Sequence, residues 1–414
     1  MMEFGLIGEH LGHSFSREIH GMLTDAPYEL RELRPDELAK FLKDREFRGI
    51  NVTIPYKRAV MPHLDVIAES ARLTGAVNCI VNDGGRLYGH NTDYDGFIAL
   101  ARHAGIDFSG AKVVILGAGG AASAVAAAAR AMGAASVRNA VRNVRTPEQL
   151  PICQPESWSD CEILVNATPV GMYPDWNSSP ADISTLPRLR GVLDCIYNPL
   201  RTRLVLDARE RGIPAEGGLY MLVGQAVRAR ELFDGTTLPA DSCQTVYDRI
   251  LRSKRNLVLC GMPSSGKSSV GRGLASSCGR RFIDTDDIIA LQAGMEIPGI
   301  FAREGEDGFR RRETAAIESI APEQGLIIAT GGGAVLKEEN VRLLRHNGII
   351  CLLERDIELL TPTADRPLSQ DRDALISLYT KRLPYYSKAA DIRVSNNGPL
   401  PATIEELLNY VDRG

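Results

Sequence analysis

The chain has 414 residues, 44% hydrophobic and 24% charged, which is the balance of an ordinary globular protein with material for several cores. At roughly 150 residues per domain, this length predicts about three domains. The formal net charge of −4 argues against a protein built around nucleic acid or an anionic membrane surface.

Cysteine usage and the apolar segments point to a reducing, aqueous compartment. The eight cysteines are scattered without a CxxC pair or the spacing of a metal site, so we expect reduced thiols. The first residues, MMEFGLIGEHLGHS, have neither the basic nor the apolar segment of a signal peptide. The most apolar stretch, 117–137, is mostly Gly and Ala and contains Arg130, which favours a buried helix over a membrane span. We therefore expect a cytoplasmic protein.

The order of predicted elements indicates an α/β protein. Apolar runs at 49–55 and 78–83 alternate with helix-like stretches. Two later segments, starting at Lys112 and Asn256, each read as an apolar strand, a glycine-rich turn and a helix, so we expect two nucleotide sites. The strand at Asn256 is expected to lie centrally in a sheet of its own. The basic run LRSKR places the main boundary near Lys254.

The first glycine-rich turn fits G-x-G-x-x-A. Gly117 would make the tight turn, Gly119 would let the backbone approach a pyrophosphate, and the small Ala122 would allow the helix to pack closely on the strand. The turn, with Gly120, is therefore a candidate dinucleotide site, and the alternative is a simple glycine turn.

The residues after this turn favour NADP over NAD. An NAD site usually has Asp or Glu about 20 residues on, to bind the ribose 2′-hydroxyl. No acidic residue occurs between Lys112 and Glu148, whereas Arg138, Arg142 and Arg145 do. Arginines suit a 2′-phosphate, and the alternative is a solvated basic turn. Which arginine contacts the phosphate is left open: Arg142 and Arg145 are the main candidates, and Arg138 is the further one.

Short polar motifs precede the turn. They are Gly12-His-Ser14-Phe-Ser16, Asn51-Val-Thr53-Ile-Pro-Tyr-Lys57, Gly75-Ala-Val-Asn78 and Asn91-Thr-Asp93. Hydroxyl and amide side chains at strand ends suit a polyol carboxylate, and a lysine with an aspartate could transfer a proton at a hydroxyl that becomes a ketone. Each motif taken alone is more often a cap or a turn.

Taken together with the motifs at 165–172, 194–199 and 217–225, this pattern resembles shikimate dehydrogenase over residues 1–250. The resemblance implies a substrate α/β domain (1–100, completed by a C-terminal helix at 236–252) and a Rossmann NADP-binding domain (101–235). It implies that Lys57 and Asp93 are the catalytic pair. The implied substrate-binding residues are Ser14, Ser16, Thr53, Asn78, Tyr197 and Gln225. The sequence departs from the family in three places. Arg17 stands where proline is common and Cys79 where threonine is common, and the usual Asn-Arg-Thr after the second Rossmann strand appears only as Arg142-Asn-Val-Arg145-Thr.

The second glycine-rich turn, Gly261-Met-Pro-Ser-Ser-Gly266-Lys267-Ser268, matches G-x-x-x-x-G-K-[ST] in full. Backbone N–H groups of such a loop, here continued by Ser269, surround phosphates; Lys267 reaches the β/γ oxygens and Ser268 ligates Mg²⁺. We therefore expect ATP and Mg²⁺ at this site. Farther on, Asp284 and Asp286 are two residues apart after a predicted strand, so strand alternation predicts that both carboxylates point to one face.

The later motifs resemble shikimate kinase over residues 255–414. They are Phe309-Arg310-Arg-Arg-Glu313, Thr330-Gly331-Gly332-Gly333, Asp365-Arg366-Pro-Leu and Lys381-Arg382. The resemblance implies a P-loop kinase domain (254–414) like the nucleoside monophosphate kinases, with a lid around 359–372. The implied roles are Asp286 at the acceptor hydroxyl, Asp284 at magnesium, Arg310 and Arg382 on the substrate carboxylate, Gly331, Gly332 and Gly333 along the ring, and Arg366 on the ATP phosphates. We interpret Glu313 as a residue that steadies an arginine, and a second lid arginine common in the family is missing near Leu359.

The sequence thus predicts two α/β enzymes in one chain. The first would reduce 3-dehydroshikimate to shikimate with NADP(H), and the second would phosphorylate the 3-hydroxyl of shikimate with ATP. The expected partners are these small molecules, with no nucleic acid and no membrane. The alternatives are a quinate or shikimate dehydrogenase with a kinase-like domain, and a regulator that keeps both folds as ligand sensors. Lys57, Asp93, Lys267, Ser268 and Asp286 argue against the sensor, because a pure binder needs no proton-transfer pair and no γ-phosphate lysine.

Overall fold

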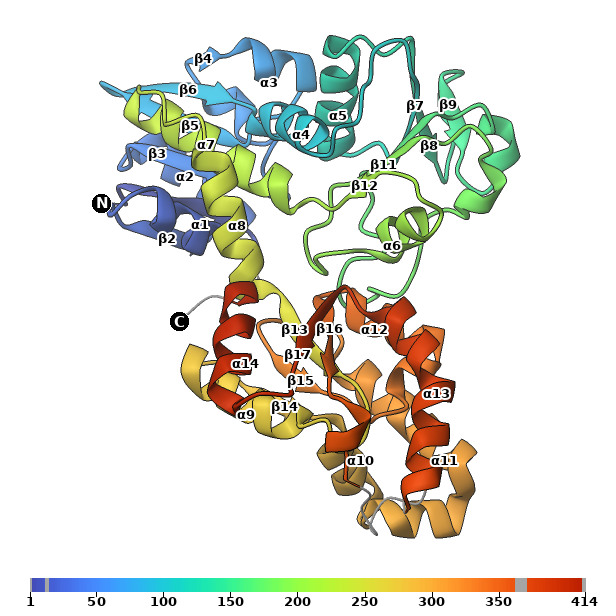
Figure 1. Cartoon of the computed structure of the whole chain (residues 1–414). Helices are drawn as coiled ribbons and strands as arrows, with labels where there is room; N and C mark the ends of the chain where they lie inside the picture. Colours follow the sequence, from blue (N-terminus) through green and yellow to red (C-terminus); the bar gives the residue numbers. More distant parts are fainter. Residues whose placement is uncertain (1, 12–14, 362–370, 412–414) are drawn as a thin grey trace. The chain divides into compact units, whose positions relative to one another are not determined.

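The computed structural model of the chain describes residues 2–11, 15–361 and 371–411 (Figure 1). It divides into two compact units, Met1–Ile250 and Leu251–Gly414. The boundary expected near Lys254 therefore falls within α8 (Ser242–Lys254). All eight cysteines are free thiols. Among the described residues, no helix combines the length and the apolarity that a membrane crossing requires.

The first sheet of the first unit has the strand order β2-β1-β3-β5-β6-β4. Its strands are β1 (Phe4–Gly8), β2 (Tyr28–Glu32), β3 (Gly49–Val52), β4 (Val66–Ile67), β5 (Cys79–Asp83) and β6 (Arg86–His90). Strand β1 pairs in parallel with β2 and β3, whereas β5 is antiparallel to β3 and β6. Leu38 and Phe41 of α2 (Pro35–Asp44) pack in the core on one face together with Ile50 and Val52 of β3. The alternation of inward and outward residues in β3 follows from the period of two in a strand.

The second sheet of this unit is all parallel, with the order β12-β11-β10-β7-β8-β9. Its strands are β7 (Lys112–Leu116), β8 (Ser136–Val141), β9 (Gln149–Pro151), β10 (Ile163–Asn166), β11 (Gly191–Asp194) and β12 (Ala215–Glu216). The helices of this part are α4 (Thr92–His103), α5 (Gly120–Ala131) and α6 (Arg203–Glu210). The strand order changes direction between β7 and β10, and ligands of open α/β sheets bind at such a switch point.

Helix α7 (Leu219–Asp234) packs along α4 and also covers the other face of the first sheet, beside α1 (Ser16–Leu23). Its Phe233 stacks on Phe4 of β1 at 5.4 Å between ring centroids. A Cβ atom at Gly49 would lie 2.2 Å from the Phe233 ring, so only glycine fits there. The sequence analysis placed this helix in the Rossmann domain and expected a helix at 236–252 to complete the substrate domain. In the structure α8 packs through Tyr247, whose ring lies 5.0 Å from that of His103.

The second unit contains one parallel sheet with the order β14-β15-β13-β16-β17. Its strands are β13 (Asn256–Cys260), β14 (Phe282–Asp284), β15 (Ile327–Ala329), β16 (Gly348–Glu354) and β17 (Ile392–Ser395). Its helices are α9 (Lys267–Cys278), α10 (Thr285–Ala293), α11 (Ile297–Ile320), α12 (Glu338–Arg345), α13 (Arg372–Ala389) and α14 (Leu400–Leu407). Strand β13 is central, as the sequence predicted, so the glycine-rich turn that follows it lies at the carboxyl edge of the sheet.

Candidate active sites

A cavity of about 600 Å³ lies in the first unit, where β3, α4, α7 and the loop after β11 converge. Every described residue that the sequence analysis proposed for the first substrate lines this cavity: Ser16, Thr53, Lys57, Asn78, Asp93, Tyr197 and Gln225. Ser14 lies outside the described residues. Residues as far apart in sequence as Ser16 and Gln225 therefore line one cavity, and they present hydroxyl, amide and charged groups to it.

The Lys57 ammonium lies 2.6 Å from a carboxylate oxygen of Asp93. The two side chains are 21% and 5% exposed, so the lysine is the member that faces the cavity. Asp93 is in the first turn of α4, where the partial positive charge of the helix end favours a carboxylate. The Asn91 side chain caps the same helix by accepting a hydrogen bond from Tyr94 N at 3.3 Å. Lys57 can therefore donate a proton to a substrate oxygen while Asp93 holds its ammonium group in place.

Asn78 lines the cavity and is hydrogen-bonded to the first residue of α4. Its Oδ1 accepts a hydrogen bond from the backbone N–H of Thr92 at 2.7 Å, and its Nδ2 lies 3.2 Å from the Thr92 hydroxyl. Two of the departures from the family, Cys79 and Arg17, lie in the same domain. Cys79 is fully buried in the core beneath α7, and Arg17 Nε donates to Tyr28 O at 3.3 Å.

Tyr197 and Gln225 enter the cavity from the second half of the unit. The Tyr197 ring lies 5.2 Å from Phe15, and burial raises the pKa of Tyr197, which keeps its hydroxyl neutral. Gln225 comes from α7, which approaches α4 closely because Gly96 has no side chain. A Cβ atom at Gly96 would lie 2.7 Å from Gln225 Cγ and 2.5 Å from Met221 O.

Asn51 is a cavity residue that the sequence analysis did not assign. It accepts a hydrogen bond from the Tyr28 hydroxyl at 2.8 Å and donates to Asn78 O at 3.3 Å. The available signal was its place at the head of the motif that contains Thr53 and Lys57, two residues that had been assigned.

The glycine turn after β7 has the geometry that a dinucleotide phosphate site needs. Gly117 has φ +106°, a value that favours glycine, and a Cβ there would lie 3.2 Å from Ala167 O. Gly119 is the N-cap of α5, and a Cβ atom on Gly119 or Gly120 would meet nothing within 4 Å. Ala122 is fully buried on the inner side of α5. The backbone N–H groups at the start of α5 are therefore open to an anion.

The three arginines near this turn differ in their surroundings. Arg138 lies within β8, and its Nη2 is 2.9 Å from an Asp160 oxygen. Arg142 and Arg145 follow the end of β8 at Val141 and are exposed. Because Arg138 is already paired with a carboxylate, the geometry favours Arg142 and Arg145 as the residues that face a ribose phosphate.

The second glycine-rich turn follows β13. Gly261 and Gly266 have φ +143° and +91°, and a Cβ at Gly261 would lie 2.8 Å from Leu353 O. The Lys267 ammonium is buried across the loop, where it donates to Gly261 O at 3.0 Å and to Met262 O at 2.9 Å. These contacts keep the charge inside the loop, at the position that a phosphate would occupy.

Two oxygen ligands suited to Mg²⁺ lie beside the loop. The Ser268 hydroxyl donates to Asp284 Oδ2 at 2.6 Å. Hydroxyl and carboxylate oxygens are the donors that Mg²⁺ prefers next to nucleotide phosphates, so these residues fit the ion. Ser269, also assigned to the nucleotide, is exposed on the first turn of α9.

The prediction that Asp284 and Asp286 alternate along one strand is wrong. Strand β14 ends at Asp284, and Asp286 lies in the first turn of α10. Asp284 is the N-cap of that helix, and its Oδ1 accepts a hydrogen bond from Asp286 N at 3.1 Å. Capping by the aspartate side chain starts a helix where the sequence suggested a longer strand. The cap therefore brings the Asp284 carboxylate to the backbone N–H of Asp286.

The glycine triplet after β15 lies against three of the predicted kinase residues. A Cβ at Gly331 would be 2.9 Å from Asp286 Oδ1, one at Gly332 would be 3.2 Å from Arg382 Nη1, and one at Gly333 would be 2.1 Å from Arg310 Nη1. A Cβ atom on Gly331 or Gly333 would therefore overlap Asp286 or Arg310, and one on Gly332 would be in tight contact with Arg382. The triplet lets Asp286, Arg310 and Arg382 converge on one site.

Glu313 orients one arginine of this site. It is fully buried, and its Oε2 lies 2.8 Å from Arg310 Nη1. Burial raises the pKa of Glu313, and the charge of Arg310 opposes that rise. Arg310 also contacts Glu306 at 3.0 Å. The interpretation of Glu313 as a residue that steadies an arginine agrees with these contacts.

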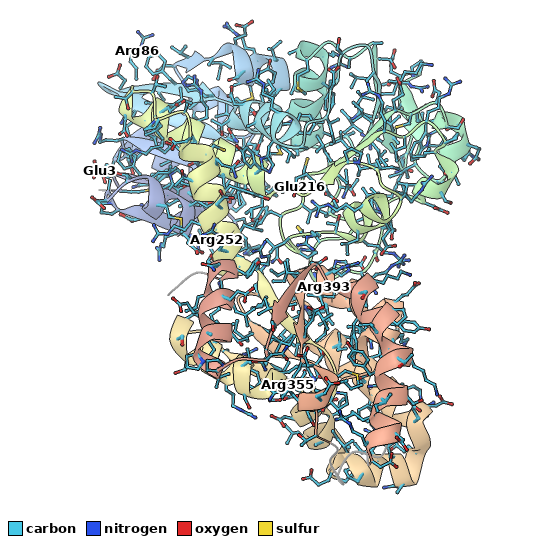
Figure 2. The ribbon with its side chains drawn as sticks, viewed as in Figure 1. Glu3, Arg86, Glu216, Arg252, Arg355 and Arg393 are labelled. Atoms are coloured by element: carbon cyan, nitrogen blue, oxygen red, sulfur yellow. The ribbon has the colours of Figure 1, made fainter. Side chains whose placement is uncertain are left out.

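The arginines around the expected lid are described only in part. Arg366 lies outside the described residues, as do 362–370 of the lid placed at 359–372. Arg355, labelled in Figure 2, follows β16 and donates from Nη1 to Asn396 O at 3.2 Å. Asn396 in turn donates to Ser265 O of the phosphate loop at 2.8 Å. Arg355 is therefore a cation at the border of this loop that the sequence analysis did not single out.

Comparisons with known proteins place both halves of the chain. Residues 6–80 match the family model of the shikimate dehydrogenase substrate binding domain, and residues 263–412 match that of shikimate kinase. The chain is 35% identical over 270 residues to the NADP-dependent shikimate dehydrogenase of Clostridium perfringens, covering 60% of this chain and 98% of the relative.

Solved structures agree with this assignment over the first unit. The shikimate 5-dehydrogenase of Thermus thermophilus, solved in complex with NADP(H) and shikimate, is 32% identical with a TM-score of 0.54, covering 60% of this chain and 99% of that one. The 5-ketofructose reductase of a Gluconobacter species is also 32% identical, with a TM-score of 0.52, covering 60% of this chain and 98% of that one.

Proposed function

We propose that this chain, which belongs to the shikimate dehydrogenase family and carries a shikimate kinase domain behind that enzyme, performs two successive reactions on one hydroxy acid. The first is the NADPH-dependent reduction of 3-dehydroshikimate to shikimate. The second is the ATP-dependent phosphorylation of shikimate to shikimate 3-phosphate. The observation that carries the proposal is that each unit holds the groups that its reaction needs: Lys57 with Asp93 at the cavity of the first unit, and in the second unit Lys267 in the phosphate loop and Asp286 against the glycine triplet.

In the first reaction, bound NADPH supplies the hydride that reaches the ring carbonyl carbon. Lys57 would hold the carbonyl oxygen and give it a proton as the alcohol forms. Asp93, 2.6 Å away, keeps the ammonium directed at that oxygen and stabilises its charge. Ser16, Thr53 and the amide groups of the cavity would bind the carboxylate and hydroxyl groups. A donor held in place in this way contributes in both directions of the reaction, because both ketone and alcohol oxygens accept hydrogen bonds.

In the second reaction, ATP with Mg²⁺ supplies the γ-phosphoryl group. Asp286 would accept the proton of the attacking hydroxyl. Lys267 would stabilise charge on the transferred group, and Ser268 with Asp284 would hold the ion. Arg310 and Arg382 suit the substrate carboxylate because a guanidinium is planar, always charged and able to bind both carboxylate oxygens.

A coupled assay tests the whole proposal. The full chain is incubated with 3-dehydroshikimate, NADPH and ATP, and shikimate 3-phosphate is quantified. We expect product only when all three are present. Faster oxidation of quinate than of shikimate would indicate the alternative dehydrogenase, and binding of the ligands without turnover in either unit would indicate a sensor.

The two exposed arginines after β8, Arg142 and Arg145, give a prediction about the cofactor. NADP should be preferred over NAD, because the ribose end of the site has arginines and no carboxylate. If Arg142 is the main contact, Arg142→Ala should raise KM for NADP by roughly tenfold, the loss of one charge-assisted hydrogen bond, with little change for NAD. Steady-state kinetics with both cofactors measure this. An unchanged KM for NADP would move the assignment to Arg145, and equal kcat/KM for the two cofactors would refute the preference.

The two activities should survive separation of the units. Residues 254 and 255 already bond within the second unit, since Lys254 O accepts from Gly325 N at 2.9 Å and Arg255 O accepts from Arg280 Nη1 at 2.9 Å. We therefore choose fragments 1–250 and 251–414, each long enough to bury a core. Each fragment should unfold cooperatively and keep most of its activity. A fragment that is inactive alone but recovers when the other is added would show that the units depend on each other.

A further inference from the structure

Three side chains beside the dehydrogenase cavity form one connected group. Asn51, at the cavity, accepts a hydrogen bond on Oδ1 from the Tyr28 hydroxyl at 2.8 Å. The imidazole of His20, from helix α1, also lines the cavity and stacks on the Tyr28 ring. Tyr28 is on β2 and Asn51 on β3, so the tyrosine reaches across β1. The group thus joins two strands and helix α1 at the wall of the cavity.

His20 and Tyr28 are held rigidly against each other. Their rings stack with centroids 3.9 Å apart and planes 8° from parallel. Both are buried, with 2% and 7% of their surface exposed. Burial, aided by the nearby charge of Arg230, lowers the pKa of His20 to about 3. The imidazole is therefore neutral and has one N–H to donate.

The hydrogen bonds determine which way the Asn51 amide faces. The backbone carbonyl of Asn78 can only accept a hydrogen bond, so the amide nitrogen of Asn51 faces it, at 3.3 Å. The amide oxygen then accepts from the Tyr28 hydroxyl at 2.8 Å. Turning the amide over would place its oxygen against the Asn78 carbonyl oxygen, and neither could donate to the other. The amide nitrogen has a second N–H, which is left for a ligand.

We propose that Tyr28, held by its stack on His20, is a positioning residue that keeps the Asn51 amide with its nitrogen towards the substrate, so that Asn51 acts as a fixed hydrogen-bond donor to a substrate oxygen. The inference rests on the proposed dehydrogenase function and adds two residues that act through Asn51. A donor that is oriented before binding pays little ordering entropy when the ligand arrives. Because a hydroxyl oxygen away from the reacting carbon accepts this bond equally in ground state and transition state, its loss affects KM more than kcat.

Tyr28→Phe is the sharpest test, because it removes the hydroxyl and keeps the stacked ring. KM for 3-dehydroshikimate should rise about 3- to 10-fold, the effect of one hydrogen bond, while kcat stays within about twofold and KM for NADPH is unchanged. Thr74→Val is the matched control. It removes a buried hydroxyl of the same sheet domain that bonds Ser70 O at 2.9 Å and does not line the cavity, so it should affect stability and leave KM unchanged.

A double-mutant cycle separates positioning from general destabilisation. In an Asn51→Ala background, Tyr28→Phe should have no further effect on KM, because the group it orients is gone. An unchanged KM in the folded Tyr28→Phe variant, or the same fold-change in both backgrounds, would overturn the proposal. If Tyr28→Phe does not fold, His20→Ala, which removes the ring stacked on Tyr28, is tested in both backgrounds and judged by the same criteria. A wild-type chain that does not reduce 3-dehydroshikimate would instead refute the proposed function.

Discussion

Lys57→Ala is expected to lower kcat for NADPH-dependent reduction of 3-dehydroshikimate by about 10²–10⁴-fold, the usual contribution of a general acid or base. The ammonium lies at the cavity, 2.6 Å from Asp93, and is the lysine that lines this cavity among the described residues. Phosphorylation of added shikimate by the same preparation should be unchanged, because the kinase residues belong to the other unit. Both rates are measured on one sample of the full chain.

Removing this lysine also leaves Asp93 without its partner in a nearly buried position, which can cost stability. Thermal unfolding of the variant therefore accompanies the kinetics. Lys43→Ala, an exposed lysine of α2, is the control for loss of a positive charge in the same domain. If the Lys57→Ala variant is folded and keeps more than about a tenth of the wild-type kcat, this result would contradict the proton-transfer role.

The elements that the sequence predicted well are those in which local chemistry and fold agree. The turns at Gly117 and Gly261 require positive φ, and glycine is the residue that adopts it without strain. Each turn follows a strand whose residues are almost all buried. The apolar run in the sequence therefore indicated both the strand and its length. The central position of β13 follows from the same feature, since a strand covered on both faces belongs inside a sheet.

The parts that the sequence did not predict depend on contacts between distant residues or on a local competition. The stretch after Phe282 can continue as a strand or begin a helix, and the Asp284 cap decides for the helix. Helix α7 could have covered either sheet, and the fit of Phe233 over Gly49 places it on the first. Asn51 looked like one more strand residue, because its contact with the Tyr28 hydroxyl comes from a segment 23 residues away in the chain.

Asp286→Asn should remove kinase turnover, by about 10²–10⁴-fold if the carboxylate accepts the hydroxyl proton, while ATP affinity stays near wild type. The side chain lies against Gly331, on the side of the site where the glycine triplet meets Arg310 and Arg382. The nucleotide, in contrast, would be held by the loop around Lys267, whose contacts go to Gly261 O and Met262 O. The substitution also keeps the backbone N–H of residue 286, which donates a hydrogen bond to the Asp284 cap.

Asp284→Asn is the matched comparison, because it changes a carboxylate two residues away that contacts Ser268 at 2.6 Å. This variant should weaken Mg²⁺-dependent ATP binding, which isothermal titration calorimetry with and without Mg²⁺ measures directly. Reduction of 3-dehydroshikimate by the same samples reports whether the rest of the chain is intact. Parallel loss of ATP affinity and turnover in Asp286→Asn would mean that the substitution disturbs the loop or the ion, and the acceptor role assigned to Asp286 would then be wrong. Retained affinity with lost turnover, set against weakened affinity in Asp284→Asn, would separate the carboxylate that serves the hydroxyl from the one that serves the metal.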